Sequence, residues 1–206
     1  LTVKTADGQK RLLISANASL PLIYLSDKNK PSPMTAPNFC MLLRKHIANG
    51  RIVEISQPKL ERIIRFTIKH LDDLGDLCRK VLIVEIMGKH SNIIFCSEEG
   101  KIIDSIKHIP AQVSSVREVL PGRDYFIPDT MHKADPLTVS RENFTRLLTE
   151  KPLALSKAIY TSFTGISPVT AEEICCLAGM DSSIPAKEYH EDILLHLFHQ
   201  FDIYFS

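Results

Sequence analysis

Gly88-Lys89-His90-Ser91 is the stretch of this sequence that comes closest to a known chemical motif. It interrupts two runs of strand-forming residues, in VEIMGKHSNIIF. The stretch resembles the Gly-Lys-Ser/Thr end of a phosphate-binding P-loop. However, the upstream glycine is missing, and a strand follows where a P-loop needs a helix. We therefore do not expect a site that hydrolyses nucleotides.

The same stretch could supply a base and a nucleophile, because His90, Ser91 and Asp104 could be drawn as a triad. A turn histidine beside a serine is more often a hairpin residue than a base. The sequence also lacks the G-x-S-x-G, H-E-x-x-H and G-x-G-x-x-G motifs. We predict that the chain is not an enzyme and has no catalytic residue, metal site or cofactor.

Four Lys-His dipeptides recur in the first half of the chain. They are Lys45-His46, Lys69-His70, Lys89-His90 and Lys107-His108. Because neighbouring residues of a strand point to opposite faces, one member of a strand pair can face solvent while the other packs. Any single pair could instead be an edge charge that keeps a sheet from pairing with another chain. Together the four pairs predict a basic surface with phosphate contacts.

A predicted helix over Phe39–Asn49 adds to this basic character. Its apolar stripe consists of Phe39, Leu42, Leu43 and Ile47. This spacing places Arg44, Lys45 and His46 toward the other side of the helix. Such a cluster suits phosphate oxygens, because Arg binds them bidentately and Lys supplies a point charge. An ordinary solvated face is the alternative interpretation.

A second motif lies in Thr164–Ile174, which reads TGISPVTAEEI and resembles a helix-hairpin-helix. Ser167 is the expected N-cap of its second helix, and Pro168 the expected first residue. The start of that helix would offer N–H groups to a phosphate. Ser167 replaces a glycine of the motif, Val169 replaces a commonly basic residue, and two glutamates follow in the first turn. A structural or RNA-facing role is therefore favoured over duplex-DNA binding.

The elements that must position these residues can be predicted from periodicity. Strands are expected over Lys10–Ser15, Leu22–Leu25, Arg51–Gln57, Ile63–His70, Val81–Met87, Asn92–Ser97 and Lys101–Ile106. The helix among them should begin at an N-cap Asn38 and end with Gly50 in the left-handed conformation. Asn92–Ser97 and the strand after it should pair through Glu98-Glu99-Gly100, which is typical of a hairpin turn.

The periodicity becomes helical after Pro121-Gly122 and the irregular segment 128–136. Apolar residues recur at helical spacing in Arg141–Leu148, Leu153–Phe163, Val169–Ala178 and Glu188–Phe201. We therefore predict an α+β chain, with a mixed β-rich domain over 1–130 and a small all-α helix-hairpin-helix domain over 137–206.

Composition limits the class of protein. The 206 residues are 44% hydrophobic, enough to bury a core, and no apolar run approaches the roughly 18 residues of a membrane span. Five cysteines without a C-x-x-C pair suggest reduced, buried thiols in a cytoplasmic protein. The chain opens LTVKTADGQK without an initiator methionine, so we expect an excerpt of a longer protein.

The charge is divided unevenly along the chain, although the formal net charge is only +1. Residues 1–110 contain 17 Lys and Arg against 11 Asp and Glu, a net charge of +6. Residues 111–206 contain 8 against 13, a net charge of −5. The first half is therefore the better candidate for binding a polyanion, although two ordinary solvated surfaces would give the same count.

Four blocks of the sequence resemble the NFACT amino-terminal domain of the family that contains bacterial RqcH, also called fibronectin-binding protein A, and eukaryotic NEMF. The blocks are Phe39–Ile47 (FCMLLRKHI), Glu85–Ile94 (EIMGKHSNII), Ile102–His108 (IIDSIKH) and Leu120–Tyr125 (LPGRDY). The resemblance covers nearly the whole chain. It implies a first domain similar to the amino-terminal fold of formamidopyrimidine-DNA glycosylases, here without its first strands, and an incomplete helix-hairpin-helix domain.

The resemblance implies a cytoplasmic ribosome-associated quality control factor. Such a factor binds a large ribosomal subunit that carries a stalled nascent chain. It recruits a charged tRNA, alanyl in bacteria, so that the nascent chain receives a carboxy-terminal tail. The partners expected for this part are tRNA and the large subunit. The expected RNA contacts from the basic groups are Arg44, Lys45, His46, Lys89, His90, Lys107 and His108.

The resemblance also points to an acidic-basic pair. The family's Asp-Arg pair, implicated in tailing, falls on Glu61-Arg62 of PKLERII. Arg62 matches, whereas Glu61 is one methylene longer than the family's aspartate. An Arg contact to a phosphate or a base edge, oriented by the acid, is therefore expected here with altered geometry.

Two other functions are compatible with parts of the sequence. The older family name suggests an adhesin that binds fibronectin, for which export signals or repeats would be expected, and none is seen. A DNA-lesion glycosylase would require a base-flipping pocket that the sequence does not indicate. We favour the RNA-binding adaptor over both.

Overall fold

The computed structural model describes residues 1–29, 31–128 and 132–206. The chain forms two compact units. The first unit comprises Leu1–Pro58 and Arg62–Pro128. The second comprises Lys59–Glu61 and the later part of the chain, described from His132 onward. The predicted domain ranges did not anticipate that Lys59–Glu61 packs with the second unit.

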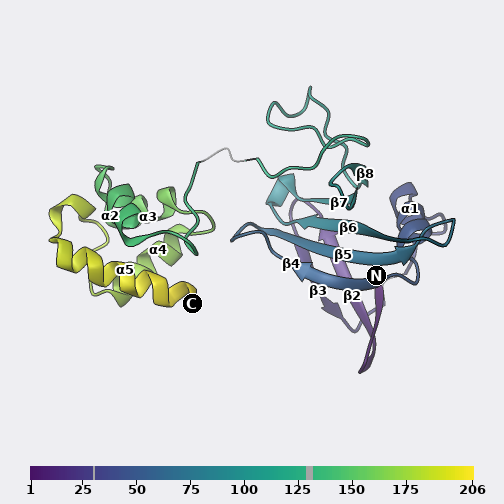
Figure 1. Cartoon of the computed structure of the whole chain (residues 1–206), viewed down its shortest axis with the longest axis horizontal. Coiled ribbons are helices and arrows are strands. Elements are labelled where there is room, and N and C mark those ends of the chain that lie inside the picture. The colour runs from purple at the N-terminus through teal and green to yellow at the C-terminus, as the bar shows by residue number, and fades with distance from the viewer. Residues whose placement is uncertain (30, 129–131) are drawn as a thin grey trace. The chain divides into compact units, whose positions relative to one another are not determined.

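A five-stranded antiparallel sheet is the centre of the first unit (Figure 1). Its strands follow each other in sequence order: β4 (Arg51–Ser56), β5 (Ile63–Leu71), β6 (Leu77–Glu85), β7 (Asn92–Ser97) and β8 (Ile102–Ser105). All five were predicted. Strand β6 begins earlier than expected, because the Asp72 carboxylate accepts the N–H groups of Leu74 and Asp76 and so forms a tight turn at the end of β5.

A second antiparallel sheet contains β1 (Thr2–Thr5), β2 (Gly8–Ala16) and β3 (Pro21–Ser26). Strand β1 was not predicted, because it is short and almost wholly exposed and shows no apolar alternation. The apolar side chains of Leu12, Ile14 and Ile23 pack against the core of the larger sheet, which includes Phe66 and Phe95. One face of the five-stranded sheet is thereby covered.

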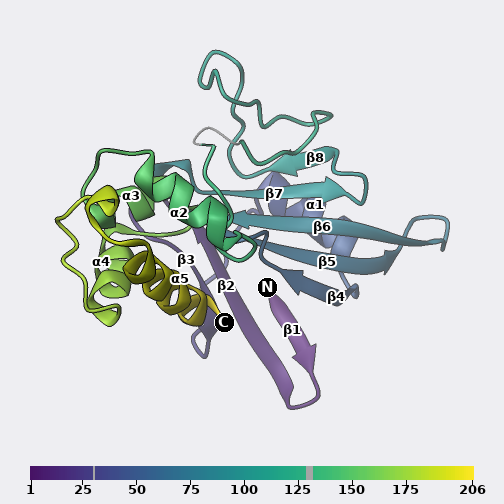
Figure 2. The ribbon, with the colours of Figure 1, turned by 60° about the vertical axis from the view of Figure 1, so that its left-hand side comes forward.

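Helix α1 (Asn38–Ile47) packs against the same core, behind the sheet in Figure 2. Two details of its prediction were wrong. Pro37 occupies the N-cap position and Asn38 is already helical. Asn49, not Gly50, has the left-handed backbone, with φ of 62°. Gly50 has a different reason to be glycine, because a Cβ atom there would lie 2.9 Å from Ile68 of β5.

The opposite face of the five-stranded sheet packs against the irregular segment that follows β8, residues 106–127. Figure 1 shows this segment next to β8. The buried core beneath it contains Ile63, Ile83, Ile94, Cys96, Ile102 and Val119. Val119 contributes no exposed surface and pairs with Ile109 through two backbone hydrogen bonds. A segment without regular structure can cover a core in this way when its polar backbone groups are paired.

A buried ion pair ties this segment to the sheet. The side chain of Glu85, at the end of β6, is fully buried. Arg117 donates to Glu85 Oε1 at 2.7 Å, and the Tyr125 hydroxyl donates to the same oxygen at 2.9 Å. Burial and the Glu85 charge both raise the pKa of Tyr125, so its phenol stays protonated and remains a donor.

A second arginine, Arg65 of β5, lies on the same tyrosine. The guanidinium carbons of Arg65 and Arg117 are 5.8 and 5.5 Å from the centre of the Tyr125 ring. Arg117 is bonded to Glu85 and to the Phe126 carbonyl, whereas the buried Nε of Arg65 has no hydrogen-bond partner among the described residues. Glu85 therefore balances only one of the two cations.

The second unit is helical. Its helices are α2 (Arg141–Thr149), α3 (Leu155–Ser162), α4 (Pro168–Leu177) and α5 (Glu191–Phe205), with a short 3₁₀ turn at Ala186–Glu188. The fully buried rings of Phe144, Phe163 and Phe201 pack together at its centre, with ring centroids 4.8 to 5.5 Å apart. The α+β class is confirmed by this combination of two antiparallel sheets and a helical unit.

Leu60 packs against the turn between α3 and α4. Gly165 has φ of +76°, and a Cβ atom added there would collide with the Leu60 side chain and lie 2.8 Å from the Leu60 carbonyl oxygen. Glycine is thus required at this position for two reasons, its backbone conformation and the close approach of Leu60.

None of the helices within the described ranges is long and apolar enough to cross a membrane. Across the same residues, no group of three or more His, Cys, Asp or Glu side chains is arranged to hold a metal ion.

Replacing Gly165 by Ala tests the contact with Leu60, and Gly179→Ala is a matched control. Both glycines have positive φ, but nothing lies within 4 Å of a Cβ atom at Gly179. We expect Gly179→Ala to lower the free energy of unfolding by about 1–2 kcal/mol through backbone strain alone. Gly165→Ala should cost about 1–3 kcal/mol more through the clash, measured by urea denaturation. Equal losses would contradict the packing of Leu60.

Replacing Glu85 by Gln tests the buried ion pair. The change leaves Arg117 buried without its counter-charge, which costs about 3–5 kcal/mol when one partner of a buried pair is removed. Tyr125→Phe removes a hydrogen bond to the same carboxylate but keeps the ion pair, so it should cost less, about 1.5–3 kcal/mol. Urea denaturation of both variants measures the difference. A Glu85→Gln variant as stable as Tyr125→Phe would show that the pair does not hold the segment.

Candidate nucleic-acid interface

Strands β6 and β7 are joined by a 3₁₀ turn at Gly88–His90. The two strands pair directly, because Val84 lies opposite Ile93 in the antiparallel ladder. Gly88 has φ of 57°, and the Ser91 hydroxyl accepts the Met87 N–H at 2.8 Å, so Ser91 satisfies one backbone donor of the turn. The side chains of Lys89 and His90 are exposed on this turn.

Lys107 lies beside the same turn, but its side chain is used to hold it. Its Nζ donates to the Ser91 carbonyl at 2.8 Å. The Asn92 amide accepts the Lys107 N–H at 3.0 Å and donates to the Lys107 carbonyl at 2.9 Å. The half-buried Lys107 is therefore a structural residue of the turn. The sequence alone predicts an RNA contact and does not indicate this structural role.

His108 is exposed, and its Nε2 lies 2.6 Å from Asp104 Oδ1. This contact also bears on the triad drawn from His90, Ser91 and Asp104. Asp104 is bonded to His108, and the Ser91 hydroxyl is bonded to the turn backbone. The structure thus gives the acid and the serine of that triad other partners.

The basic residues of α1 lie near the opposite end of the sheet. Arg44 and Lys45 are exposed, and Lys45 forms a solvent-exposed ion pair with Asp73 at 3.4 Å. His46 does not lie with them as predicted, because its ring packs 5.9 Å from the buried Phe95 ring. Burial and then the charge of Lys45 lower the pKa of His46, so it is neutral at pH 7.

Lys69-His70 belongs to the same end of the sheet, and here too the histidine points inward. His70 is only 7% exposed and lies 6.5 Å from the His46 ring. The four Lys-His pairs therefore do not form one surface. Two of them lie where α1 meets β5, and the other two lie around the turn between β6 and β7.

Glu61 and Arg62 lie where the two units meet in sequence. Glu61 is half-buried and belongs to the second unit, whereas Arg62 is exposed and belongs to the first. The Arg62 carbonyl accepts the Ile86 N–H at 2.8 Å, which places Arg62 next to the end of β6. This hydrogen bond holds the backbone from which the Arg62 guanidinium extends.

The start of α4 has the predicted local geometry. The Ser167 hydroxyl accepts the Thr170 N–H at 3.0 Å, and Pro168 is the first helical residue. Glu172 lies in the second turn, later than predicted, and hydrogen bonds from Ser182 and Ser156 lower its pKa. Because Pro168 has no N–H and the Thr170 N–H is capped, the helix start offers a phosphate few donors.

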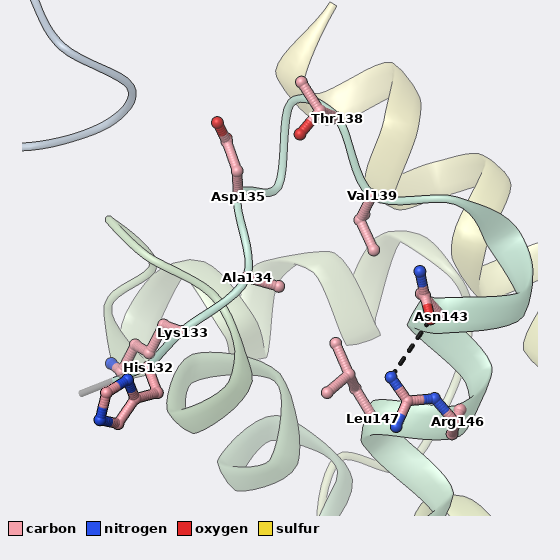
Figure 3. Close-up of a pocket in the computed structure, with 9 residues that line it drawn as sticks. All are labelled: His132, Lys133, Ala134, Asp135, Thr138, Val139, Asn143, Arg146 and Leu147. Carbon is pink, nitrogen blue, oxygen red and sulfur yellow. Dashed lines mark hydrogen bonds between the residues drawn. The ribbon is translucent and has the colours of Figure 1, made fainter. Parts of the chain in front are cut away.

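A pocket of about 410 Å³ in the second unit was not anticipated from the sequence (Figure 3). It is lined by His132, Lys133, Ala134, Asp135, Thr138, Val139, Asn143, Arg146 and Leu147. The lysine and the arginine that line the pocket already donate hydrogen bonds to other protein atoms. Lys133 Nζ donates to the Tyr160 carbonyl at 2.7 Å, and Arg146 donates to Asn143 Oδ1 at 3.2 Å.

Comparison with known proteins places this geometry in a family. The family model described as NFACT N-terminal and middle domains matches residues 1–206. The chain is 39% identical over 183 residues to Rqc2 homolog RqcH of Bacillus subtilis (strain 168), covering 88% of this chain and 32% of that protein. It is 36% identical over 175 residues to Rqc2 homolog RqcH of Streptococcus suis (strain 05ZYH33), covering 84% and 32%. The chain thus spans about a third of the length of these relatives.

Solved structures give the same result. The N-terminal part of the fibronectin/fibrinogen-binding protein from Streptococcus suis superposes with a TM-score of 0.77 at 33% identity, covering 98% of this chain and 71% of that one. The fibrinogen binding protein from Staphylococcus aureus gives 0.78 at 29% identity, covering 97% and 67%. The predicted resemblance is confirmed, and the chain belongs to the NFACT amino-terminal family.

Proposed function

We propose that this chain is the tRNA- and ribosome-binding part of a ribosome-associated quality control factor. The observation that carries the proposal is the 39% identity over 88% of the chain with a protein named Rqc2 homolog RqcH. In this role the protein acts in the cytoplasm on large ribosomal subunits that hold a stalled nascent chain. It recruits charged tRNA for carboxy-terminal alanine tailing, and the ribosome supplies the peptide-bond chemistry.

The exposed cations of the first unit are the contacts through which the chain binds RNA in this proposal. Arg62 is exposed, lies on a fixed backbone and can bind a phosphate bidentately. Arg44 and Lys45 form a second group on α1, and Lys89 and His90 form a third on the turn. Lys107 and His46 support these groups through their contacts with Ser91 and Phe95, and His108 adds an exposed ring that is paired with Asp104.

The helical unit has a different part in this proposal. We propose that α3 and α4 form the helix-hairpin-helix, and that the first unit shares the amino-terminal fold of formamidopyrimidine-DNA glycosylases. The capped start of α4 and the close contact of Gly165 with Leu60 favour a packing role for this hairpin over a phosphate site.

A fibronectin-binding adhesin is a second candidate, because structural neighbours are named fibronectin- or fibrinogen-binding proteins. Fibronectin binding requires a surface that recognises a protein, whereas RNA binding requires exposed cations such as Arg62, Arg44 and Lys45. Salt dependence separates the two, because phosphate contacts release counterions when they form.

Binding of tRNA to the chain, measured at two salt concentrations, tests the RNA function. Arg62→Ala should weaken binding about tenfold through the loss of one charged contact. The double variant Arg44→Ala/Lys45→Ala removes two contacts, so the slope of log K against log salt should fall by about 0.7–0.9 for each. Fluorescence anisotropy with labelled tRNA measures both effects.

The matched control is Lys4→Ala/Lys10→Ala, which removes the same charge from exposed positions on β1 and β2. It should leave the affinity within about twofold, since long-range charge effects are screened. The RNA function is wrong if both double variants weaken binding equally. It is also wrong if the chain ignores tRNA and captures fibronectin at submicromolar concentration.

A further inference from the structure

Leucine side chains are exposed at the tip of the hairpin that joins β5 and β6. Leu71 and Leu77 lie directly opposite each other at the end of the ladder, and Leu74 lies in the turn between them. Their exposed fractions are 65%, 60% and 87%. A single exposed leucine is ordinary, whereas a group of them on one tip marks an interaction site. Figure 2 shows this turn extending beyond the ends of β4 and β7.

The turn that carries Leu74 is ordered by hydrogen bonds. Asp72 Oδ1 accepts the N–H groups of Leu74 and Asp76, each at 2.9 Å. The Asp72 N–H donates to the Asp76 carbonyl at 2.9 Å, and the Gly75 N–H donates to the Asp72 carbonyl at 3.1 Å. Leu74 is thus presented in a fixed position, so a partner that binds it does not have to order the turn first.

Negative charge surrounds these leucines. Asp72, Asp73 and Asp76 lie between them, and residues 71–77 contain no Lys, Arg or His. Asp73 forms an exposed ion pair with Lys45 of α1 at 3.4 Å. Asp76 contributes its backbone to the turn, and the residue is exposed. The tip is therefore acidic as well as apolar, although residues 1–110 carry a net charge of +6.

This combination of charge and apolar surface selects the kind of partner. Carboxylates repel phosphates, and leucine lacks the aromatic face on which nucleic-acid bases stack, so RNA does not fit the tip. A membrane with anionic headgroups is disfavoured by the same charge. Basic residues resume at Lys69 and Arg79, two ladder positions behind the leucine pair, where Arg79 is paired with Glu98. A protein surface with an apolar hollow surrounded by Lys and Arg complements both features of the tip.

We propose that the tip of the β5–β6 hairpin, residues 71–77, docks into an apolar hollow on a basic protein of the large ribosomal subunit. The proposal rests on the proposed function, which makes the large subunit a partner of this chain. Leu74 enters the hollow, Leu71 and Leu77 cover its edge, and Asp76 faces the cations around it. The first unit thus contacts the subunit through protein at this tip and through RNA at its exposed cations.

Cosedimentation of the whole chain with purified bacterial large ribosomal subunits tests the docking. Leu74→Ser should weaken binding about tenfold or more, because an apolar side chain is no longer buried. The matched control is Leu20→Ser, which alters a leucine that is 65% exposed in the turn between β2 and β3, and it should change the affinity less than about twofold. Thermal unfolding of each variant shows that it is folded.

Reversing the charge of Asp76 separates a basic protein from RNA as the partner of the tip. Asp76→Lys keeps the backbone groups that the turn uses. It should weaken binding to the subunit at least severalfold if cations surround the hollow, whereas an RNA partner would bind the variant more tightly. A photoreactive benzophenone amino acid in place of Leu74 should crosslink to a basic ribosomal protein.

The proposal is overturned if the wild-type chain does not bind the subunit, if folded Leu74→Ser binds like the wild type, or if Asp76→Lys binds more tightly. Crosslinks from position 74 only to rRNA or to a second copy of the chain also overturn it. Labelled tRNA keeps this result apart from the RNA function, because Leu74→Ser should bind tRNA like the wild type. A chain that binds the subunit through the tip but ignores tRNA would contradict the RNA function and support the docking.

Discussion

The buried carboxylate of Glu85 is the interaction on which the geometry of the first unit depends. A charge taken out of water is tolerated only when cations and donors surround it, and Arg117 and Tyr125 supply them. Both come from the irregular segment after β8. This one pair therefore fixes a segment that has little regular structure of its own, and with it the burial of Val119 and the course of the chain from Lys107 onward.

The network around Tyr125 contains two arginines, Arg65 and Arg117, but only one described carboxylate, Glu85. Arg117 is neutralised by Glu85, whereas the Arg65 guanidinium lies over the Tyr125 ring, and its buried Nε has no hydrogen-bond acceptor among the residues that the structure describes. A guanidinium tolerates this place better than an ammonium would, because it is weakly hydrated and stacks on aromatic faces. One positive charge of the first half of the sequence, that of the half-buried Arg65, thus lies partly inside the fold.

Local signals in the sequence were enough to predict most elements. Alternation marked β4 to β8, and Ser167-Pro168 marked the start of α4. Features that depend on register were not predictable. The inward turn of His46 and His70 requires α1 to lie on one particular face, and the role of Lys107 requires Asn92 of another strand as a partner. The sequence shows which residues are basic, but not which basic side chains already pack or form hydrogen bonds within the fold.

The separation of the basic groups limits what can bind them. Lys80, near α1, pairs with Ser97, and Glu85, near the turn, pairs with Asn92. Five residues of strand separate these positions, a distance of roughly 17 Å. A single small anion cannot reach both groups, whereas a nucleic-acid backbone presents phosphates along its whole length. Groups so far apart should contribute almost additively to binding, as expected of a polyanion surface but not of one compact anion pocket.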